Sequence, residues 1–450
     1  MASESEIKTE KESTGVQTMK ATDTITRAVE ELKSIAHVDA GIIHKRHSRY
    51  QGKTAIPYTM DEVNEQYKPF NVNLCKTAVD AVAERIRLKS VDLEDEQLTA
   101  RARRLFQRAN FDAVLPALVT EMLALGKSYA LIWPDNRGVI SVTAESPLAM
   151  TVDTNPISGE VTRALKTWSV DRGRGLEEYA ALYLPEVITI VKGTNANLEV
   201  VEQLPNPLGI VPIVPLVNAA RPGDTGISVI DDMGHIVDAL SKVLIDMLVT
   251  SEDVARPRRW ATGVTLQSGG GDATDWTADS DAPGARISYG SFDDDEDEAT
   301  SPFDESNRMW TAESEAAKFG QLDGASLSGY RTAVDLLVQQ IMAVSDLPAH
   351  MVGITTANPG SADGIRASEA GLTARAEARI RIVARAVEHI AQIMLAMDTG
   401  RLPGDYAPAA TFANPGTRST AQEADAVTKL HALGIISTDE ARAMMGINTL

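Results

Sequence analysis

The stretch that decides the fold is residues 326–397, SLSGYRTAVDLLVQQIMAVSDLPAHMVGITTANPGSADGIRASEAGLTARAEARIRIVARAVEHIAQIMLAM. Its first part has apolar residues spaced by three and four, which places them on one face of a helix. These residues are Leu327, Tyr330, Val334, Leu337, Ile341 and Val344. Pro348 ends this helix, because proline lacks the N–H donor and crowds the preceding turn. A second stripe consists of Leu372, Ala376, Ile380, Val383, Val387, Ile390, Met394 and Met397. The stretch therefore predicts two long amphipathic helices joined by a polar loop at residues 353–364.

Another long helix is predicted upstream, at residues 228–254. Ser228 and Asp231 form a capping-box-like pair, and Leu240 and Leu244 continue an apolar pattern spaced by three and four. At 1.5 Å per residue this helix would be about 40 Å long, and Pro257 would stop it.

The region between the N-terminal helices and residue 228 favours strands. Alternating apolar and polar residues, separated by turn pairs such as Asn155-Pro156, are typical of an antiparallel sheet. The strands are expected at residues 128–133, 139–144, 148–153, 163–170, 178–184 and 187–192, with an edge strand within 205–215. Helices and an antiparallel sheet together indicate an α+β fold.

Composition limits the function. A chain of 450 residues should hold two or three domains. The net charge of -20 is opposite to that of a protein that grips phosphates, and it fits either simple solubility or a surface that DNA passes without sticking. Cys75 is the single cysteine, so no internal disulfide is expected. We expect no secretory signal and no membrane span.

Three charged segments are ambiguous. Residues 1–21 are polar and are predicted to form a disordered arm. The basic stretch at residues 44–49 is a solvated loop or, alternatively, a phosphate or partner contact. The acidic run at residues 293–298 lies in an insertion poor in apolar residues, and it is an exposed loop or a divalent-cation site.

The sequence gives little support for a catalytic motif. Gly126-Lys127-Ser128 resembles the end of a phosphate-binding loop, but Glu121 stands where its first glycine is required, and a helix precedes the motif where a strand should. The seven histidines are scattered without zinc-ligand spacing. We therefore expect no metal, no cofactor and no enzymatic activity.

The long helices call for a covering partner, because an apolar stripe is stable only when it is buried. The last of them also carries arginines at positions 366, 375, 379, 381 and 385, which form either a solvated face or salt bridges between subunits. The candidates for a subunit interface are Leu240, Leu244, Leu337, Ile341, Arg379, Val383 and Arg385.

Several short blocks, in order, resemble the portal proteins of tailed double-stranded-DNA phages, of the siphophage type. The blocks are Tyr50-Gln-Gly52, Asn73 with Val79-Asp80, Glu84-Arg85, Leu123-Ala-Leu-Gly126 with Tyr129, Asn206-Pro-Leu-Gly209, Gly226-Ile-Ser228, residues 255–263, Lys318-Phe-Gly-Gln-Leu322, Leu347-Pro-Ala-His350, and Asn358-Pro-Gly-Ser-Ala362 with Ile365 and Glu369. The acidic insertion at 269–304 and the C-terminal residues 414–450 have no clear counterpart.

The resemblance implies a portal fold with long stem helices, a mixed wing domain, a clip insertion and a mainly helical crown. The implied parts are an arm at 1–21, a wing at 22–222, the first stem helix at 223–256, the clip at 257–318, the second stem helix at 319–347, a channel loop at 348–365, and wing or crown helices at 366–450.

The resemblance also implies a ring, commonly of twelve subunits, at one capsid vertex of the virion, assembled in the host cytoplasm. Its implied partners are the terminase large subunit, the major capsid and scaffolding proteins, a head-completion protein, and DNA passing without sequence specificity. The channel-loop residues facing DNA would be Thr355, Thr356, Asn358, Ser361 and Asp363. The alternative is a cytosolic helical scaffold that does not enclose DNA.

Overall fold

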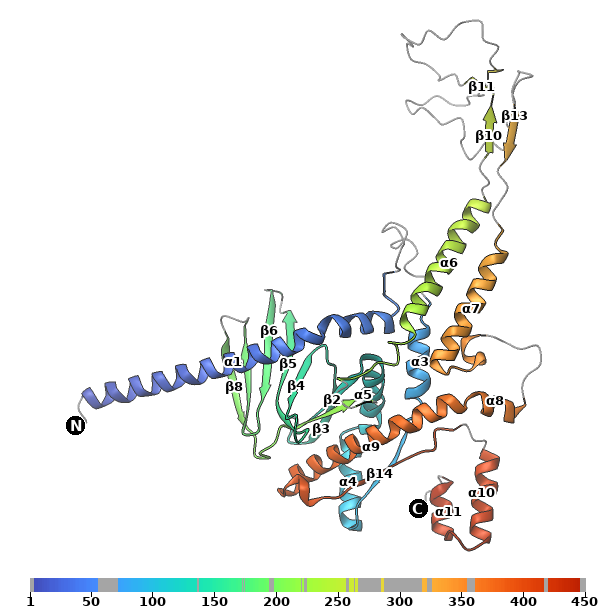
Figure 1. Ribbon diagram of the computed structural model, residues 1–450. Coiled ribbons are helices and arrows are strands. Elements are labelled where there is room, and N and C mark those ends of the chain that lie inside the picture. The colour runs from blue at the N-terminus through green and yellow to red at the C-terminus, as the bar shows by residue number, and fades with distance from the viewer. Residues whose placement is uncertain are drawn as a thin grey trace, which may run out of the picture. The chain divides into compact units, whose positions relative to one another are not determined.

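The computed structural model describes residues 4–55, 72–135, 137–171, 173, 175–193, 198–219, 221, 225–255, 259–262, 264–265, 285–286, 318–321, 326–353, 361–416 and 420–445 (Figure 1). The chain divides into a larger unit, Met1–Lys242 with Leu336–Leu450, and a smaller unit, Val243–Asp335. The mixture of helices and antiparallel sheets confirms the expected α+β class. No described helix is both long and apolar enough to cross a membrane.

The larger unit begins with one long helix, α1 (Glu4–Tyr50). Residues 4–21 are therefore helical where a disordered arm was expected. The basic stretch at 44–49 is also part of this helix, so the prediction of a loop there was wrong. The reason is cooperativity: Val29 and Leu32 are fully buried and fix the helix, and extension from a formed helix is easy where no proline intervenes.

Two antiparallel sheets follow. The larger has the order β4-β5-β6-β7-β8, and the smaller has the order β3-β2-β9. Their strands are β2 (Lys127–Pro134), β3 (Ile140–Glu145), β4 (Met150–Thr154), β5 (Val161–Asp171), β6 (Leu176–Tyr183), β7 (Val187–Lys192), β8 (Glu199–Pro205) and β9 (Ile213–Val217). All six strands expected at residues 128–192 are present, and β9, which overlaps the end of the predicted edge segment 205–215, lies at a sheet edge.

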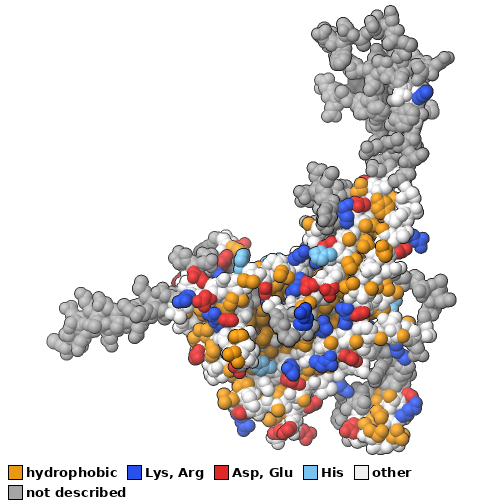
Figure 2. Space-filling model, in the orientation of Figure 1, with side chains coloured by type: hydrophobic (Ala, Val, Ile, Leu, Met, Phe, Trp, Pro, Cys, Tyr) orange, Lys and Arg blue, Asp and Glu red, His pale blue; other side chains and the backbone are white. Residues whose placement is uncertain are grey.

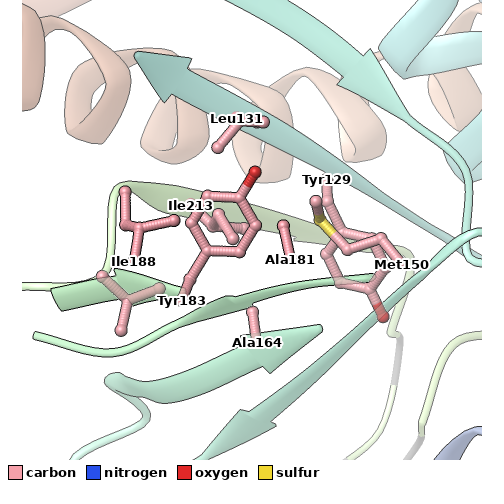
Figure 3. Close-up of a cluster of buried hydrophobic side chains, with 9 residues drawn as sticks. Tyr129, Leu131, Met150, Ala164, Ala181, Tyr183, Ile188 and Ile213 are labelled. Carbon is pink, nitrogen blue, oxygen red and sulfur yellow. The ribbon is translucent and has the colours of Figure 1, made fainter. Parts of the chain in front are cut away.

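Side chains alternate along each strand, so the five-stranded sheet has two faces, and each face carries a buried cluster. On one face, Leu165 and Leu182 pack against Val29 and Leu32 of α1. On the other face, a second cluster joins this sheet to β2 and β9 (Figure 3). Its buried members are Tyr129, Leu131, Met150, Ala164, Ala181, Tyr183, Ile188, Val211 and Ile213. The sheet is thus a central layer between α1 and the smaller sheet.

Helices surround this core. They are α3 (Leu74–Ala83), α4 (Glu96–Arg108), α5 (Phe111–Leu125) and α9 (Ala370–Thr399), and a short ladder pairs β1 (Leu88–Asp92) with β14 (Ala409–Phe412). The C-terminal end carries η3 (Pro403–Asp405), α10 (Thr420–Ala432) and α11 (Thr438–Met444). Helix α9 contacts α3, α4, β9 and β14, so it runs through the larger unit as a core helix.

The other two predicted long helices are α6 (Gly234–Ala255) and α7 (Ser328–Ser345). Helix α6 begins six residues later than expected, because residues 229–233 form turns after Ser228, but it ends before Pro257 as predicted. Helix α6 begins in the larger unit and ends in the smaller one, and α7 begins in the smaller unit and ends in the larger one.

Within the smaller unit, the hydroxyl oxygens of Thr250 and Tyr330 lie 3.0 Å apart and link α6 to α7. Beyond the helices, β10 (Arg259–Thr262) pairs antiparallel with β13 (Lys318–Gln321), and β11 (Val264–Thr265) pairs parallel with β12 (Ala285–Arg286). The acidic run at 293–298 lies outside the described residues.

Three of the predicted interface residues have a different role. Leu240, Ile341 and Val383 are 2%, 0% and 0% exposed in a single chain. These three side chains are buried by the chain's own fold, so they need no neighbouring subunit, and the inference from stripe to interface was wrong for them. Of the other four, Leu244, Leu337 and Arg379 are partly buried and Arg385 is exposed.

We expect Val383→Asp to unfold the subunit itself, because the new carboxylate has no partner in the core. The loss of stability should be about 3 kcal/mol or more, measured as a fall in Tm by thermal unfolding. Arg385→Glu, two residues away on the exposed face of α9, is the control and should leave Tm nearly unchanged. A folded Val383→Asp subunit with wild-type Tm would show that this position is not in the core.

Candidate functional site: two polar junctions in the larger unit

The first junction, here called the α5 node, forms where α5 ends. The last carbonyl groups of a helix lack partners within the helix, and buried ones must find them elsewhere. Leu123 and Leu125 are almost fully buried. Their carbonyl groups are reached by segments that lie far away in the sequence.

Two of the α5 carbonyl groups bond to the turn that precedes α6. The Val229 N–H donates to the Leu123 oxygen at 3.0 Å, and the buried Ser228 hydroxyl donates to the Ala124 oxygen at 2.5 Å. The Asn218 N–H donates to the Gly126 oxygen at 2.9 Å. The end of α5 and the turn after it are thus hydrogen-bonded to the segment between β9 and α6.

Arg46 of α1 completes the α5 node. It donates to the Leu125 oxygen at 2.7 Å, where a cation also suits the negative end of the helix dipole. Its other nitrogens donate to both carboxylate oxygens of Asp231, at 2.9 and 2.6 Å. A two-pronged arginine–carboxylate contact fixes orientation as well as distance. Arg46 therefore holds α1, α5 and the turn before α6 together.

Two glycines allow the backbone at the end of α5 to come close to the backbone of the segment before α6. Gly126 and Gly226 have φ of +93° and +116°, and a Cβ on Gly226 would lie 2.6 Å from the Gly126 oxygen. Gly126 is the C-terminal cap of α5, at the turn from this helix to β2. The Gly-Lys-Ser segment is thus a structural turn, not a phosphate loop.

One helical turn further along, Arg49 makes a similar contact with α6. Its guanidinium donates to Asp238 at 2.6 Å and to His235 Nδ1 at 3.2 Å. Arg49 is 7% exposed, and a Cβ on Gly234 would collide with it at 2.4 Å. The basic stretch at 44–49 therefore supplies two intrachain anchors for the start of α6, a role that neither sequence interpretation anticipated.

Tyr50 extends the contacts to α3. Its hydroxyl donates to Asp80 at 3.0 Å, and its carbonyl oxygen accepts from the Asn73 side chain at 2.8 Å. Burial, followed by the bond to Asp80, raises the pKa of Tyr50 to about 12. The blocks around Tyr50, Asn73 and Asp80 that carried the family resemblance thus meet in space.

The second junction, here called the loop clamp, lies at the two ends of the predicted channel loop. Before the loop come Asp346 and the short helix η2 (Ala349–Val352); after it come α8 (Ala362–Ser368) and α9. Glu369, between α8 and α9, is 6% exposed. Its carboxylate pairs with His350 and with Arg85, each at 3.3 Å.

A further contact closes the loop clamp. Arg375 pairs with the Asp346 carboxylate and donates to the Val344 oxygen at 2.7 Å. Asp346 has φ of +55°, and a Cβ on Gly371 would lie 3.1 Å from its side chain. The chain just before the predicted loop is therefore pinned at two places to the chain just after it.

The predicted loop residues fall into two groups. Thr355, Thr356 and Asn358 lie outside the described residues. Ser361 is exposed and caps α8 by accepting from the Gly364 N–H at 3.1 Å, and Asp363 belongs to α8. Because α8 begins at Ala362, the loop is shorter at its C-terminal end than the predicted 348–365.

Both junctions hold elements in place by ion pairs and hydrogen bonds. Within the described residues, no cluster of three or more His, Cys, Asp or Glu side chains could hold a metal. Cys75 is buried, and burial raises the pKa of its thiol to about 12, which leaves it unreactive at neutral pH. The contacts of both junctions fix segments of one chain to one another.

Comparison with known proteins identifies the family. The family model described as phage portal protein, SPP1 Gp6-like, matches residues 32–447, so the chain belongs to this family. Membership makes it a structural subunit of the phage particle, located at the capsid vertex through which DNA passes.

The chain is also similar to individual known proteins. The portal proteins of Mycobacterium phages L5 and D29 are each 29% identical over 391 residues, covering 82% of this chain and 74% of theirs. Among solved structures, the neck of an empty gene transfer agent particle has a TM-score of 0.45 at 12% identity, covering 87% of this chain and 91% of that one. The neck of a native particle has a TM-score of 0.44 at 13% identity, covering 89% and 98%.

We expect Gly226→Ala to destabilise the subunit far more than Gly175→Ala. Both glycines have φ of +116°, but only Gly226 faces another backbone, whereas a Cβ on Gly175 meets nothing within 4 Å. The cost of placing an alanine at this positive φ, about 1 kcal/mol, is therefore common to both variants. Any further loss of stability in Gly226→Ala measures the close approach of Gly226 to the Gly126 backbone. Thermal unfolding of both variants gives the comparison, and equal losses of Tm would contradict the α5 node.

We expect Glu369→Ala to cost about 3 kcal/mol, because it leaves Arg85 charged in a largely buried position. Asp425→Ala is the matched control: Asp425 pairs with Lys429 at 2.6 Å, but both side chains are more than 60% exposed, so its loss should stay below about 1 kcal/mol. Chemical denaturation measures both. Similar small losses would show that the loop clamp contributes little.

Proposed function

We propose that identical copies of this portal subunit close into a ring, commonly of twelve, around a channel for double-stranded DNA. In this proposal residues 22–222 form the wing, α6 and α7 form the stem, the segment 257–318 between them forms the clip, and the helices after residue 366 contribute to wing and crown. The segment between η2 and α8 would face DNA. The ring would assemble in the cytoplasm of the bacterial host.

The observation that carries the proposal is the charge of the segment between Gly353 and Gly364. It contains no Lys or Arg, and Asp363 is its only charged residue. Every phosphate contact by a cation releases counterions and adds affinity, so a basic loop would retain the DNA that must move past it. An uncharged or weakly acidic loop whose ends are fixed by the loop clamp can touch a duplex without holding it.

The surface of the long helices supports a ring. Hydrophobic side chains appear at the surface along α6 and α7 (Figure 2). Among them, Val249, Leu327 and Leu336 are 37%, 36% and 56% exposed. A ring supplies each helix with neighbours on both sides, which would cover such residues. Leu244 and Leu337 remain interface candidates for the same reason.

The arginines of α9 add a charge argument. Burial, and then the like charge of Arg375, lower the pKa of Arg379, which indicates a guanidinium that would gain from a nearby carboxylate. Exposed Arg385 lies on the same helix. In the proposed ring, acidic groups of a neighbouring subunit would meet these arginines.

The partners of the ring follow from its position. The clip would contact the terminase large subunit during packaging and a head-completion protein afterwards, and the wing would contact the major capsid and scaffolding proteins. The clip carries the acidic run 293–298, which gives these contacts a strongly negative segment.

The test combines imaging with packaging. The wild-type protein should form annular particles in negative-stain microscopy and a single ring mass in mass photometry. The variant Thr355→Lys, Thr356→Lys, Asn358→Lys should keep the ring but lower the DNA packaging yield about tenfold or more at low salt. Added salt should restore part of the yield, because it screens the new phosphate contacts.

The control replaces the same three residues without charge, as Thr355→Ser, Thr356→Ser and Asn358→Gln, and should package normally. Unchanged packaging by the lysine variant would remove this segment from the channel. Compact dimers in place of annular wild-type particles would favour the cytosolic scaffold.

A further inference from the structure

The strongest unexplained surface in the larger unit lies on α1. Val29, Leu32 and Ile43 of this helix are buried in the core, at 0%, 0% and 4% exposure. Another face of the same helix is apolar and uncovered: Ile35, Val38 and Ile42 are 40%, 79% and 56% exposed. Their spacing of three and four places all three on one side of the helix, within two turns. We call these three residues the α1 stripe.

The α1 stripe differs from the other exposed apolar residues of this unit. Ile157, Leu176 and Leu402 are also highly exposed, but they come singly from the turn between β4 and β5, the start of β6 and the segment after α9, and Leu433 and Ile435 lie in the short connection between α10 and α11. Single exposed apolar residues are normal on a protein surface, whereas a contiguous group commonly marks an interaction site.

The acidic side chains beside the α1 stripe are already paired within the subunit. The exposed polar neighbours in residues 34–45 include His37, His44 and Lys45, and the exposed Glu31, one turn before Ile35, pairs with Arg27 and Arg163. The acid within this segment, Asp39, is only partly exposed and pairs with Lys127 at 2.7 Å. The stripe is therefore a local apolar and basic surface on a chain whose net charge is -20.

We propose that the α1 stripe is an intersubunit contact, covered by an adjacent copy of this chain. The inference rests on the proposed ring, in which every subunit must offer two different, complementary faces to its neighbours. A basic, apolar patch is complementary to the prevailing acidic surface of an identical chain, and opposite charges at the rim favour association. An apolar centre with a polar rim is the usual arrangement of a specific interface.

The geometry within one subunit also suits such a contact. The C-terminal part of α1 is fixed by Arg46 and Arg49 to α5 and α6, and its middle is fixed by Val29 and Leu32 to the large sheet. The stripe lies between these two anchored parts. It is therefore presented on a rigid support, so little conformational entropy is lost when a neighbour covers it.

The first test is Val38→Asp in the full-length protein. Val38 is 79% exposed, so the variant should fold with the Tm of the wild-type subunit, but its ring should be weakened. We expect the concentration for half-maximal ring formation, measured by mass photometry, to rise about tenfold or more. Ile157→Asp is the matched control, since Ile157 is 96% exposed but lies outside the stripe, and it should assemble as wild type.

A second test does not depend on weakening the ring. A photo-crosslinking amino acid at position 38 should yield covalent dimers of this chain within assembled particles, with the crosslinked peptide identified by mass spectrometry. Crosslinks within one chain only, to a different protein, or to nothing would overturn the proposal. So would normal assembly of Val38→Asp. If wild-type protein forms no rings at all, the proposed function fails instead, so the two failures are distinguishable.

Discussion

The fold depends on which groups donate hydrogen bonds to the buried carbonyl groups at the end of α5. Its last carbonyl groups are buried next to Leu123 and Leu125, where water cannot serve them, and an unpaired buried carbonyl is costly. The chain supplies the partners from the turn before α6 and from Arg46 of α1. One local requirement therefore fixes the positions of a sheet strand and two long helices, and glycines at 126 and 226 permit the required closeness.

The loop clamp follows the same physical logic at the far end of α7. A carboxylate as buried as that of Glu369 must be paired, and its partners come from η2 on one side and from the region after α3 on the other. In both junctions, a charged side chain that is largely buried fixes the positions of the segments it contacts. This suits a portal subunit, whose surfaces must keep their geometry while DNA moves past.

Much of this architecture could be predicted from sequence periodicity. The patterns spaced by three and four located α6, α7 and α9, and alternation located six strands, because both patterns reflect burial of one face. Strand β8 was missed because its exposed Glu199 and Glu202 hide the alternation. The basic stretch was misread because the local sequence does not reveal that Arg46 and Arg49 have carboxylate partners nearly two hundred residues away. For the same reason periodicity identified Val383 as buried but could not tell a subunit's own core from an interface.

The pairing of β10 with β13 has a consequence for how such proteins diversify. The ladder joins residues 259–262 to 318–321, so it closes the chain at the base of the intervening segment. Lengthening a closed loop costs little additional entropy. The segment between the two strands can therefore gain, lose or exchange residues without disturbing the helices that carry it. A lineage of phages could in this way change the length and sequence of this segment while the paired strands and the larger unit stay the same.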